Sequence, residues 1–200
     1  RQTDVIVNVP LLPAQQDIYN MVKEKQKRVH KKTRKVHIGG GKMVTEEFMT
    51  DGQRLLHLKQ MSELTKVVNG THELMAGVET SKIQFFEEHL DDFLKDDAKF
   101  ACFFRYKALL NLVKQVLVKR NIEFVTITGD VSGDKREQAL TDMNEGSARV
   151  MLGTSRAAGY GVNLLTINSI LILEADWNAA IDLQTAARGS RPGNKNAVQV

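Results

Sequence analysis

Two arginines near the carboxyl end of the chain, Arg188 and Arg191, have a spacing suited to binding phosphate. Residues three apart at the end of a helix lie on one face, so both guanidinium groups can reach the same anion. Arginine stays charged and can bind phosphate oxygens through paired hydrogen bonds. Gln184 lies one turn before Arg188. The spacing therefore predicts a group that acts on the phosphates of a nucleotide.

A short apolar strand upstream leads into the run Thr154-Ser155-Arg156-Ala157-Ala158-Gly159-Tyr160-Gly161-Val162-Asn163-Leu164. Its glycines allow a tight turn and a close approach of the backbone to a phosphate. The chain lacks a G-x-x-x-x-G-K-(S/T) phosphate loop. The segment His37-Ile38-Gly39-Gly40-Gly41-Lys42 does not have that spacing, and we expect a flexible turn or hairpin tip there. Something else must hold the nucleotide.

These residues resemble the fifth and sixth motifs of superfamily-two helicases, and in detail the second motor lobe of Swi/Snf-type DNA translocases. The run from Thr154 to Leu164 is similar to the family's S/T-(K/R)-A-G-G-x-G-(I/L)-N-L pattern. The family's D-W-N-P and Q-A-x-x-R-x-x-R-x-G-Q patterns are matched by Asp176, Trp177, Asn178, Gln184, Arg188, Arg191 and Gly193. A less specific resemblance continues upstream at Leu11 to Tyr19, Thr80 to Ile83, Phe100 to Phe104 and Ile127 to Ser132.

The chain departs from the family pattern around the arginines. The family's residues are replaced at Ala179, Ala187, Ser190, Pro192 and Asn194. The spacing of the two arginines is retained, so the resemblance still implies their role, whereas the polar residues that tune coupling between ATP and DNA differ.

The resemblance implies that Arg188 and Arg191 are catalytic arginine fingers, which stabilise the charge of a transferring phosphoryl group. It implies ATP with Mg as the cofactor, held mainly by a first RecA-like lobe of the same parent chain. The residues expected to organise the ATP site are Gly159, Gly161, Asn163, Gln184, Arg188 and Arg191. The residues expected to contact a DNA backbone are Lys107, Thr128, Gly129, Ser132, Thr154, Ser155, Arg156 and Trp177.

The composition is that of a soluble globular protein. The 200 residues are 42% apolar and 26% charged, which is enough for one well-filled core and an appendage. No apolar run approaches the roughly 18 residues of a membrane span. The single cysteine, Cys102, excludes an internal disulfide, and the five histidines show no metal-ligand spacing. We expect no metal site, no membrane partner and an intracellular location: the nucleus in a eukaryote, the cytoplasm in a bacterium, or the host cell for a virus.

The positive charge is concentrated in one segment. Nine Lys/Arg and one acid, Glu24, lie from Lys23 to Lys42. Because the whole chain has 28 Lys/Arg and 24 Asp/Glu, the remainder holds 19 and 23, and the net charge of +4 arises in this segment. Two interpretations stay open. The segment either contacts a phosphate backbone or is a solvated helix end and hairpin that aids solubility.

Hydrophobic periodicity predicts helices over 13–35 and 46–69, followed by alternating strands and helices. The later helices are expected at 81–95, 107–119, 133–144 and 179–188, and the strands at 99–104, 122–127, 149–153, 168–174 and 197–200. Short apolar strands that alternate with helices predict an α/β fold with a parallel sheet and helices on both faces. The resemblance makes this sheet RecA-like. We expect a helical portion over 1–78 with a basic hairpin or loop, and a core over 79–200.

Taken together, we interpret the chain as the second motor lobe of an ATP-dependent double-stranded DNA translocase. Its expected partners are double-stranded DNA and the first lobe, and we expect a fragment that is inactive as an ATP hydrolase alone. Two alternatives stay open: a strand-separating DNA or RNA helicase lobe, and a degenerate, non-catalytic nucleic-acid-binding module.

Overall fold

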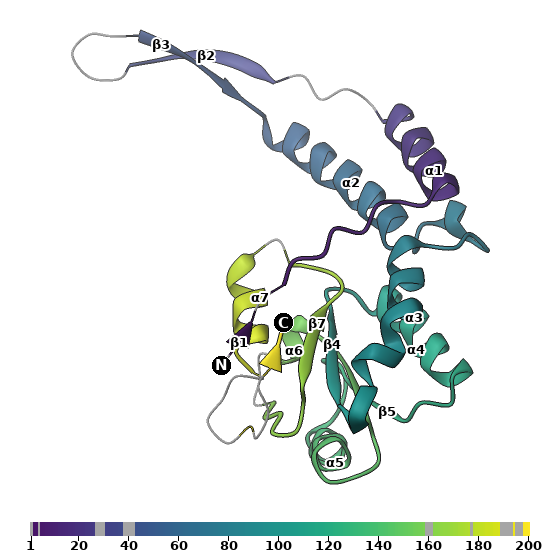
Figure 1. Ribbon diagram of the computed structural model, residues 1–200. Helices are drawn as coiled ribbons and strands as arrows, with labels where there is room; N and C mark the ends of the chain where they lie inside the picture. Colours follow the sequence, from purple (N-terminus) through teal and green to yellow (C-terminus); the bar gives the residue numbers. More distant parts are fainter. Residues whose placement is uncertain are drawn as a thin grey trace. The chain divides into compact units, whose positions relative to one another are not determined.

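The structure is a computed structural model that describes residues 2–3, 5–26, 31–37, 43–158, 162–176, 178–188, 194 and 198–200. The chain divides into two compact units, Leu11–Thr80 and Arg1–Pro10 together with Ser81–Val200 (Figure 1). The sequence-based division between residues 78 and 79 placed the first ten residues with the helical portion. In the structure they belong to the core unit. These join the core unit because Gln2–Thr3 pairs with Val198–Gln199, and the Val5 N–H donates to the Val200 carbonyl oxygen at 2.7 Å.

The core unit contains a six-stranded sheet in the order β1-β8-β7-β4-β6-β5, in which every pairing is parallel. The strands are β1 (Gln2–Thr3), β4 (Phe100–Phe104), β5 (Phe124–Ile127), β6 (Val150–Thr154), β7 (Ser169–Ile172) and β8 (Val198–Gln199). Strands β4 and β6 are buried along their whole length. A continuous apolar run forms such a strand because both of its faces are covered. The predicted parallel α/β sheet is confirmed.

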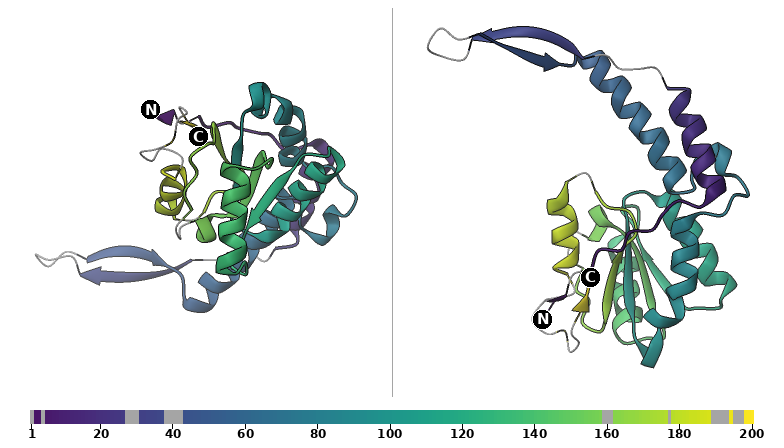
Figure 2. Two further views of the ribbon diagram at one scale, coloured as in Figure 1. Left: turned by 90° about the horizontal axis from the view of Figure 1, so that it is seen from below. Right: turned by 45° about the horizontal axis from the view of Figure 1, so that its top comes forward.

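Helices cover both faces of this sheet. They are α3 (Ser81–Phe93), α4 (Lys107–Lys119), α5 (Gly133–Asn144), α6 (Ser155–Ala158) and α7 (Ala179–Ala186), with a 3₁₀ turn, η2, at Lys95–Asp97. Alternation along β4 sends Phe100, Cys102 and Phe104 into one cluster with α3 and α4. Ala101 and Phe103 enter the opposite cluster with α5. Figure 2 shows the teal helices α3 and α4 together on one side of the sheet.

The helical unit pairs α1 (Pro13–Glu24) with α2 (Asp51–Val68) and includes a 3₁₀ turn, η1 (Glu73–Met75). Its small core consists of Val22, Leu64, Val67 and Met75. The buried Gln15 amide nitrogen donates to the carbonyl oxygens of Val67 and Val68 at 3.0 and 2.9 Å, which ties α1 to the end of α2. The expected helical portion with a basic hairpin is therefore confirmed.

The predicted boundaries of the two long helices were wrong. Strands β2 (Lys32–His37) and β3 (Met43–Phe48) occupy the end of the first predicted helix and the start of the second. The helix period does not extend there because β2 and β3 pair in an antiparallel hairpin. A capping box then starts α2: Thr50 N–H donates to Gln53 Oε1 at 2.8 Å, and Gln53 N–H donates to Thr50 Oγ1 at 3.4 Å.

Phe86 offers a test of the packing between α3 and the sheet. Its side chain is fully buried and packs near Phe100, with ring centroids 6.2 Å apart. We expect Phe86→Ala to lower the free energy of unfolding by about 3–5 kcal/mol, because the substitution leaves a cavity in the main cluster. The measurement is urea unfolding followed by circular dichroism.

The adjacent Phe85 provides a matched control because it is only half-buried and stacks on His89. Phe85→Ala should cost clearly less than Phe86→Ala. Equal losses of stability for the two variants would contradict the assigned packing of α3.

Candidate functional site

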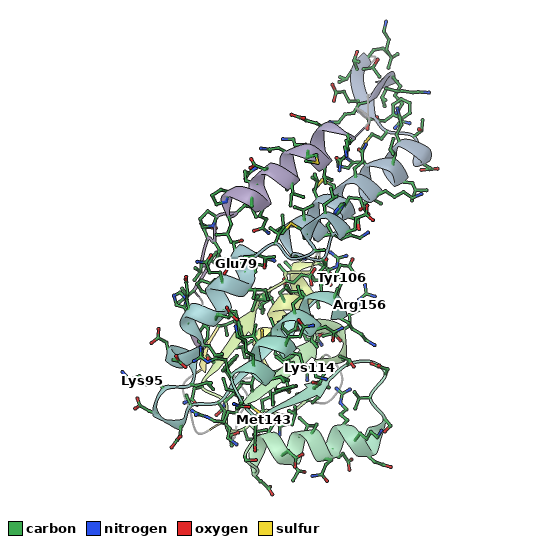
Figure 3. The ribbon with its side chains drawn as sticks, turned by 90° about the vertical axis from the view of Figure 1, so that its right-hand side faces the viewer. Glu79, Lys95, Tyr106, Lys114, Met143 and Arg156 are labelled. Atoms are coloured by element: carbon green, nitrogen blue, oxygen red, sulfur yellow. The ribbon has the colours of Figure 1, made fainter. Side chains whose placement is uncertain are left out.

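The carboxyl ends of four neighbouring strands align at one edge of the sheet. The pairing register places Ile127 beside Gly153, Gly153 beside Phe103, and Phe103 beside Ile172. The loops after β5, β6, β4 and β7 therefore leave the sheet at the same level. In Figure 3, Tyr106 and Arg156 lie at this end of the sheet, whereas Lys95 and Met143 lie toward the other end. Open parallel sheets bind ligands beyond the carboxyl ends of their strands.

The loops after β4 and β5 are joined by one carboxylate. Lys107 Nζ lies 2.8 Å from Asp130 Oδ1, and Thr128 Oγ1 donates to the same oxygen. The Lys107 and Asp130 side chains remain 53% and 68% exposed. Hydrogen bonds from Lys107 and Thr128 lower the pKa of Asp130 to about 2. The carboxylate is therefore charged at any ordinary pH. It accepts hydrogen bonds from Lys107 and Thr128, two residues that the sequence predicts to contact DNA.

A buried carboxylate joins the loops after β7 and β4. Glu174 is only 3% exposed, and its Oε2 accepts the Tyr106 N–H at 3.0 Å. Lys82, at the start of α3, donates to the Leu173 carbonyl oxygen at 2.8 Å. Burial lowers the pKa of Lys82, while the charge of Glu174 opposes that shift. These contacts fix the loop that leads from β4 to Lys107, the first residue of α4.

The connection after β6 starts with the short helix α6, where an exposed arginine follows buried hydroxyls at the end of β6 and the start of α6. Thr154 and Ser155 are buried, and Ser155 Oγ donates to the Phe104 carbonyl oxygen at 3.4 Å. Arg156 is exposed. Arg136 of α5 donates to the Ala157 carbonyl oxygen at 2.6 Å and so ties α5 to α6. Thr154 and Ser155 are placed to hold the loop, while Arg156 can reach an external anion.

The remaining described candidates for the backbone contact lie around the start of α5. Gly129 is exposed, and a Cβ atom added there would meet no atom within 4 Å. Ser132 is the N-cap residue of α5 and is exposed, with no cap hydrogen bond from its side chain. Both lie in the β5–α5 connection beside Asp130. They extend the aligned edge with groups that solvent can reach.

Helix α7 packs against α6 and carries one candidate ATP-site residue, Gln184, with Arg188 just beyond its end. Asn178 caps it by accepting the Ala180 N–H at 3.1 Å, and the Asp182 carboxylate accepts the Asp176 N–H at 3.0 and 3.2 Å. Burial raises the pKa of Asp182, as does the nearby charge of Asp176. Gln184 is exposed on α7, and Arg188 is 7% exposed just beyond its end.

Asn163 is placed away from the aligned edge. Its carbonyl oxygen accepts a hydrogen bond from Asn144 Nδ2 at 3.2 Å, at the far end of α5. Lys99 lies just before the start of β4, and its Nζ donates to the Met143 carbonyl oxygen at 2.8 Å. The end of α5 that holds Met143 and Asn144 is therefore near the amino end of β4. The structure therefore does not bring Asn163 together with Thr154 and Arg156. Gly159, Gly161, Trp177, Arg191 and Gly193 lie outside the described residues.

Sequence reasoning did not identify the two carboxylates that organise the edge, Asp130 and Glu174. Both follow apolar strands directly or within three residues, which is the position where polar groups gather in a parallel sheet. Their place after an apolar strand is the feature of the sequence that could have identified them. Among the residues that the structure describes, no group of three or more His, Cys, Asp or Glu could hold a metal ion. No described helix combines the length and apolar character needed to span a membrane.

Comparison with known proteins agrees with this arrangement. The family model of the helicase conserved C-terminal domain matches residues 81–193. The Arabidopsis thaliana ISWI chromatin-remodeling complex ATPase CHR17 is 36% identical over 110 residues, which are 54% of this chain and 10% of that protein. The Saccharomyces cerevisiae nuclear protein STH1/NPS1 is 25% identical over 205 residues, covering 100% of this chain and 15% of that protein. The chain thus spans only a small part of these relatives.

Solved structures show the same fold. The C-terminal part of the Fun30 ATPase domain superimposes with a TM-score of 0.72 at 14% identity, covering 99% of this chain and 83% of that one. The Sulfolobus solfataricus SWI2/SNF2 ATPase core in complex with dsDNA gives a TM-score of 0.70 at 18% identity, covering 99% of this chain and 40% of that one. The chain belongs to the helicase conserved C-terminal domain family, and it shares its fold with the C-terminal lobes of the Fun30 and SWI2/SNF2 ATPases.

Proposed function

We propose that this lobe works in an ATP-dependent translocase that moves along double-stranded DNA. The observation that supports this most is the alignment of the strand-end loops, which gathers Lys107, Gly129 and Arg156 at one edge of a parallel sheet. The titles of the relatives add support, since a similar SWI2/SNF2 core was solved with dsDNA and CHR17 is named a chromatin-remodeling ATPase. In a eukaryotic source the protein would act in the nucleus.

On this proposal the DNA backbone lies along the aligned edge. The exposed groups Lys107, Gly129 and Arg156 contact phosphates directly, together with Ser132. The buried hydroxyls of Thr128, Thr154 and Ser155 set the path of the loops, so that backbone N–H groups can reach the phosphates. Contacts of this kind carry no base information, which suits a motor that must cross any sequence.

The nucleotide is the second ligand that we propose. Gln184 is exposed on α7, and Arg188, which is buried, follows just beyond the end of that helix. Their amide and guanidinium groups are donors suited to phosphate oxygens. These groups can complete an ATP-Mg site but cannot hold one alone, since the chain lacks a phosphate loop. When bound, ATP supplies the phosphoryl group whose transfer to water drives movement. Arg188 and Arg191, with the glycines Gly159 and Gly161, would close on that site from this lobe.

A first RecA-like lobe elsewhere in the parent protein would hold ATP and Mg. Relatives about ten times longer than the matched region leave room for such a lobe, because the chain covers 10% of CHR17. Closing and reopening of the two lobes would move their backbone contacts relative to each other.

ATP turnover of the intact parent protein tests this function. We expect strong stimulation by duplex DNA and weaker stimulation by single-stranded DNA or RNA, because double-stranded DNA is the partner that we propose. The 200-residue chain alone should show essentially no turnover, since it lacks a phosphate loop. Stimulation by single strands or RNA alone would favour a strand-separating helicase. Absence of turnover with every nucleic acid would favour a non-catalytic binding module.

The arginine assignment has its own test in the intact protein. Arg188→Ala and Arg191→Ala should each reduce turnover by about 10³- to 10⁵-fold, because each removes charge stabilisation of the transferring phosphoryl group. Binding of a fluorescent ATP analogue should be retained. Arg120→Ala is a suitable control, since Arg120 is exposed at the end of α4 and pairs with Asp91. Turnover near the wild-type rate in both finger variants would refute the assignment.

Asp130 gives a prediction about DNA affinity. Asp130→Asn should tighten duplex binding by about threefold to tenfold at low salt, because it removes a negative charge and releases Lys107 Nζ for a phosphate. A group with a lowered pKa loses its effect only as the pH falls toward that value. The gain should therefore be constant across neutral pH, because the pKa of Asp130 is about 2.

Fluorescence anisotropy with a labelled duplex measures this effect, and Asp134→Asn supplies the control. Asp134 is exposed in the first turn of α5, four residues away, so its substitution removes the same charge without freeing Lys107. Equal gains for the two variants would show that general charge, rather than the Asp130 contacts, sets the affinity.

A further inference from the structure

The β2–β3 hairpin of the helical unit lies outside the region matched by the family model. It is a two-stranded antiparallel ribbon whose register runs from Lys32 opposite Phe48 to His37 opposite Met43. Figure 1 shows the two strands side by side before the start of α2. Every described side chain of this ribbon except Val36 and Phe48 is exposed. The ribbon therefore has two faces that solvent can reach.

The acidic residues of the ribbon fix part of its positive charge in place. Arg34 donates from Nε and from its terminal nitrogen to Glu46 Oε2 at 3.0 and 2.9 Å, and its guanidinium lies 5.2 Å from the centroid of the Phe48 ring. Lys31 Nζ lies 3.2 Å from Glu47 Oε2. Both acids are thus already engaged with cations of the same hairpin.

Two further lysines extend the positive charge to both faces. Alternation along a strand places Lys32 on the face of Arg34 and Lys35 on the opposite face. In the part of the chain that the structure describes, no ion pair joins Lys32 or Lys35 to an acid. Lys35 lies opposite Thr45, so a hydroxyl is next to this cation. The described hairpin with Lys31 carries four cations and two acids, an excess of two positive charges.

We propose that this hairpin inserts into a groove of duplex nucleic acid and contacts the phosphates of both strands. The major groove of B-form DNA admits a two-stranded β-ribbon. A ribbon lying in a groove has a phosphate backbone on each side, and each face of this ribbon carries a lysine that no acid among the described residues pairs with. Lys32 and Lys35 contact the two backbones, while Glu46 and Glu47 hold Arg34 and Lys31 in place.

The distribution of charge favours a groove over an acidic protein surface. A flat protein surface covers one face of a ribbon, and it would leave Lys32 or Lys35 in solvent. Threonine hydroxyls and lysines contact phosphates without reading bases, so the contact would not depend on sequence. The inference rests on the proposed function for its choice of duplex nucleic acid as partner. It adds a second contact surface outside residues 81–193.

The salt dependence of duplex binding tests the proposal in this 200-residue chain. The logarithm of the binding constant falls with the logarithm of salt concentration by about 0.9 for each phosphate that is neutralised. The double variant Lys32→Gln/Lys35→Gln should therefore reduce the magnitude of this slope by about 1.8 relative to the wild type. Fluorescence anisotropy with a labelled duplex of arbitrary sequence measures the slope, and circular dichroism verifies the fold.

The control variant removes the same number of positive charges at two lysines outside the hairpin. Lys95 and Lys119 are exposed, and Lys95 lies toward the end of the sheet opposite Tyr106 and Arg156 (Figure 3). The variant Lys95→Gln/Lys119→Gln should keep the wild-type slope. Equal slopes for the two double variants would overturn the hairpin proposal. A wild-type chain without salt-dependent duplex binding would instead overturn the proposed function, so the two failures can be distinguished.

Insertion into a groove is tested by cleavage from a single tethered site. The only native cysteine, Cys102, is 0% exposed, and burial raises the pKa of its thiol, so an added surface cysteine can be labelled selectively. An iron chelate attached to Thr33→Cys should cut both strands of the duplex across one groove. Cleavage confined to one strand, or none while the chain is bound, would contradict insertion.

Discussion

The register of the parallel sheet is the constraint on which the rest of the structure depends. The pairing of β5, β6, β4 and β7 aligns one residue of each strand in a row: Ile127, Gly153, Phe103 and Ile172. The loops after these strands therefore leave the sheet together. A shift of one residue in any strand would exchange its two buried faces. The apolar clusters on both sides of β4 therefore stabilise the fold and also align the loops, so the same packing that buries Phe103 positions Lys107 and Arg156.

Contacts with two carboxylates then hold the loops that the sheet has aligned. Glu174 is buried and holds the Tyr106 backbone, whereas Asp130 is exposed and holds the Lys107 side chain. The two carboxylates therefore hold their partners with different firmness. A buried carboxylate is costly to leave without partners, so Glu174 fixes its loop firmly. An exposed ion pair contributes little to stability and is readily exchanged, so Lys107 can leave Asp130 for a phosphate.

The sequence predicted the core unit well and the helical unit less well, for a physical reason. Buried parallel strands such as β4 and β6 are continuous apolar runs, and their identity and order could be inferred from the pattern. The exposed hairpin has no buried face to impose an alternation, so the pattern predicts a helix over 13–35 that overlaps the first part of β2. Contacts between loops, such as that of Lys107 with Asp130, depend on the register of distant strands, and the family resemblance suggested Lys107 without revealing its carboxylate partner. Asn163 matches the family run, yet the structure places it beside Asn144 at the far end of α5.

The most direct test of the central claim is hydrogen–deuterium exchange of this chain with and without duplex DNA. If the aligned edge binds the DNA backbone, amide protection should increase in the loops that begin after Phe104, Ile127 and Thr154. The turn at Lys95–Asp97 and the residues around Asn144 should exchange at unchanged rates. Protection confined to that opposite edge, with none in the three loops, would contradict the account.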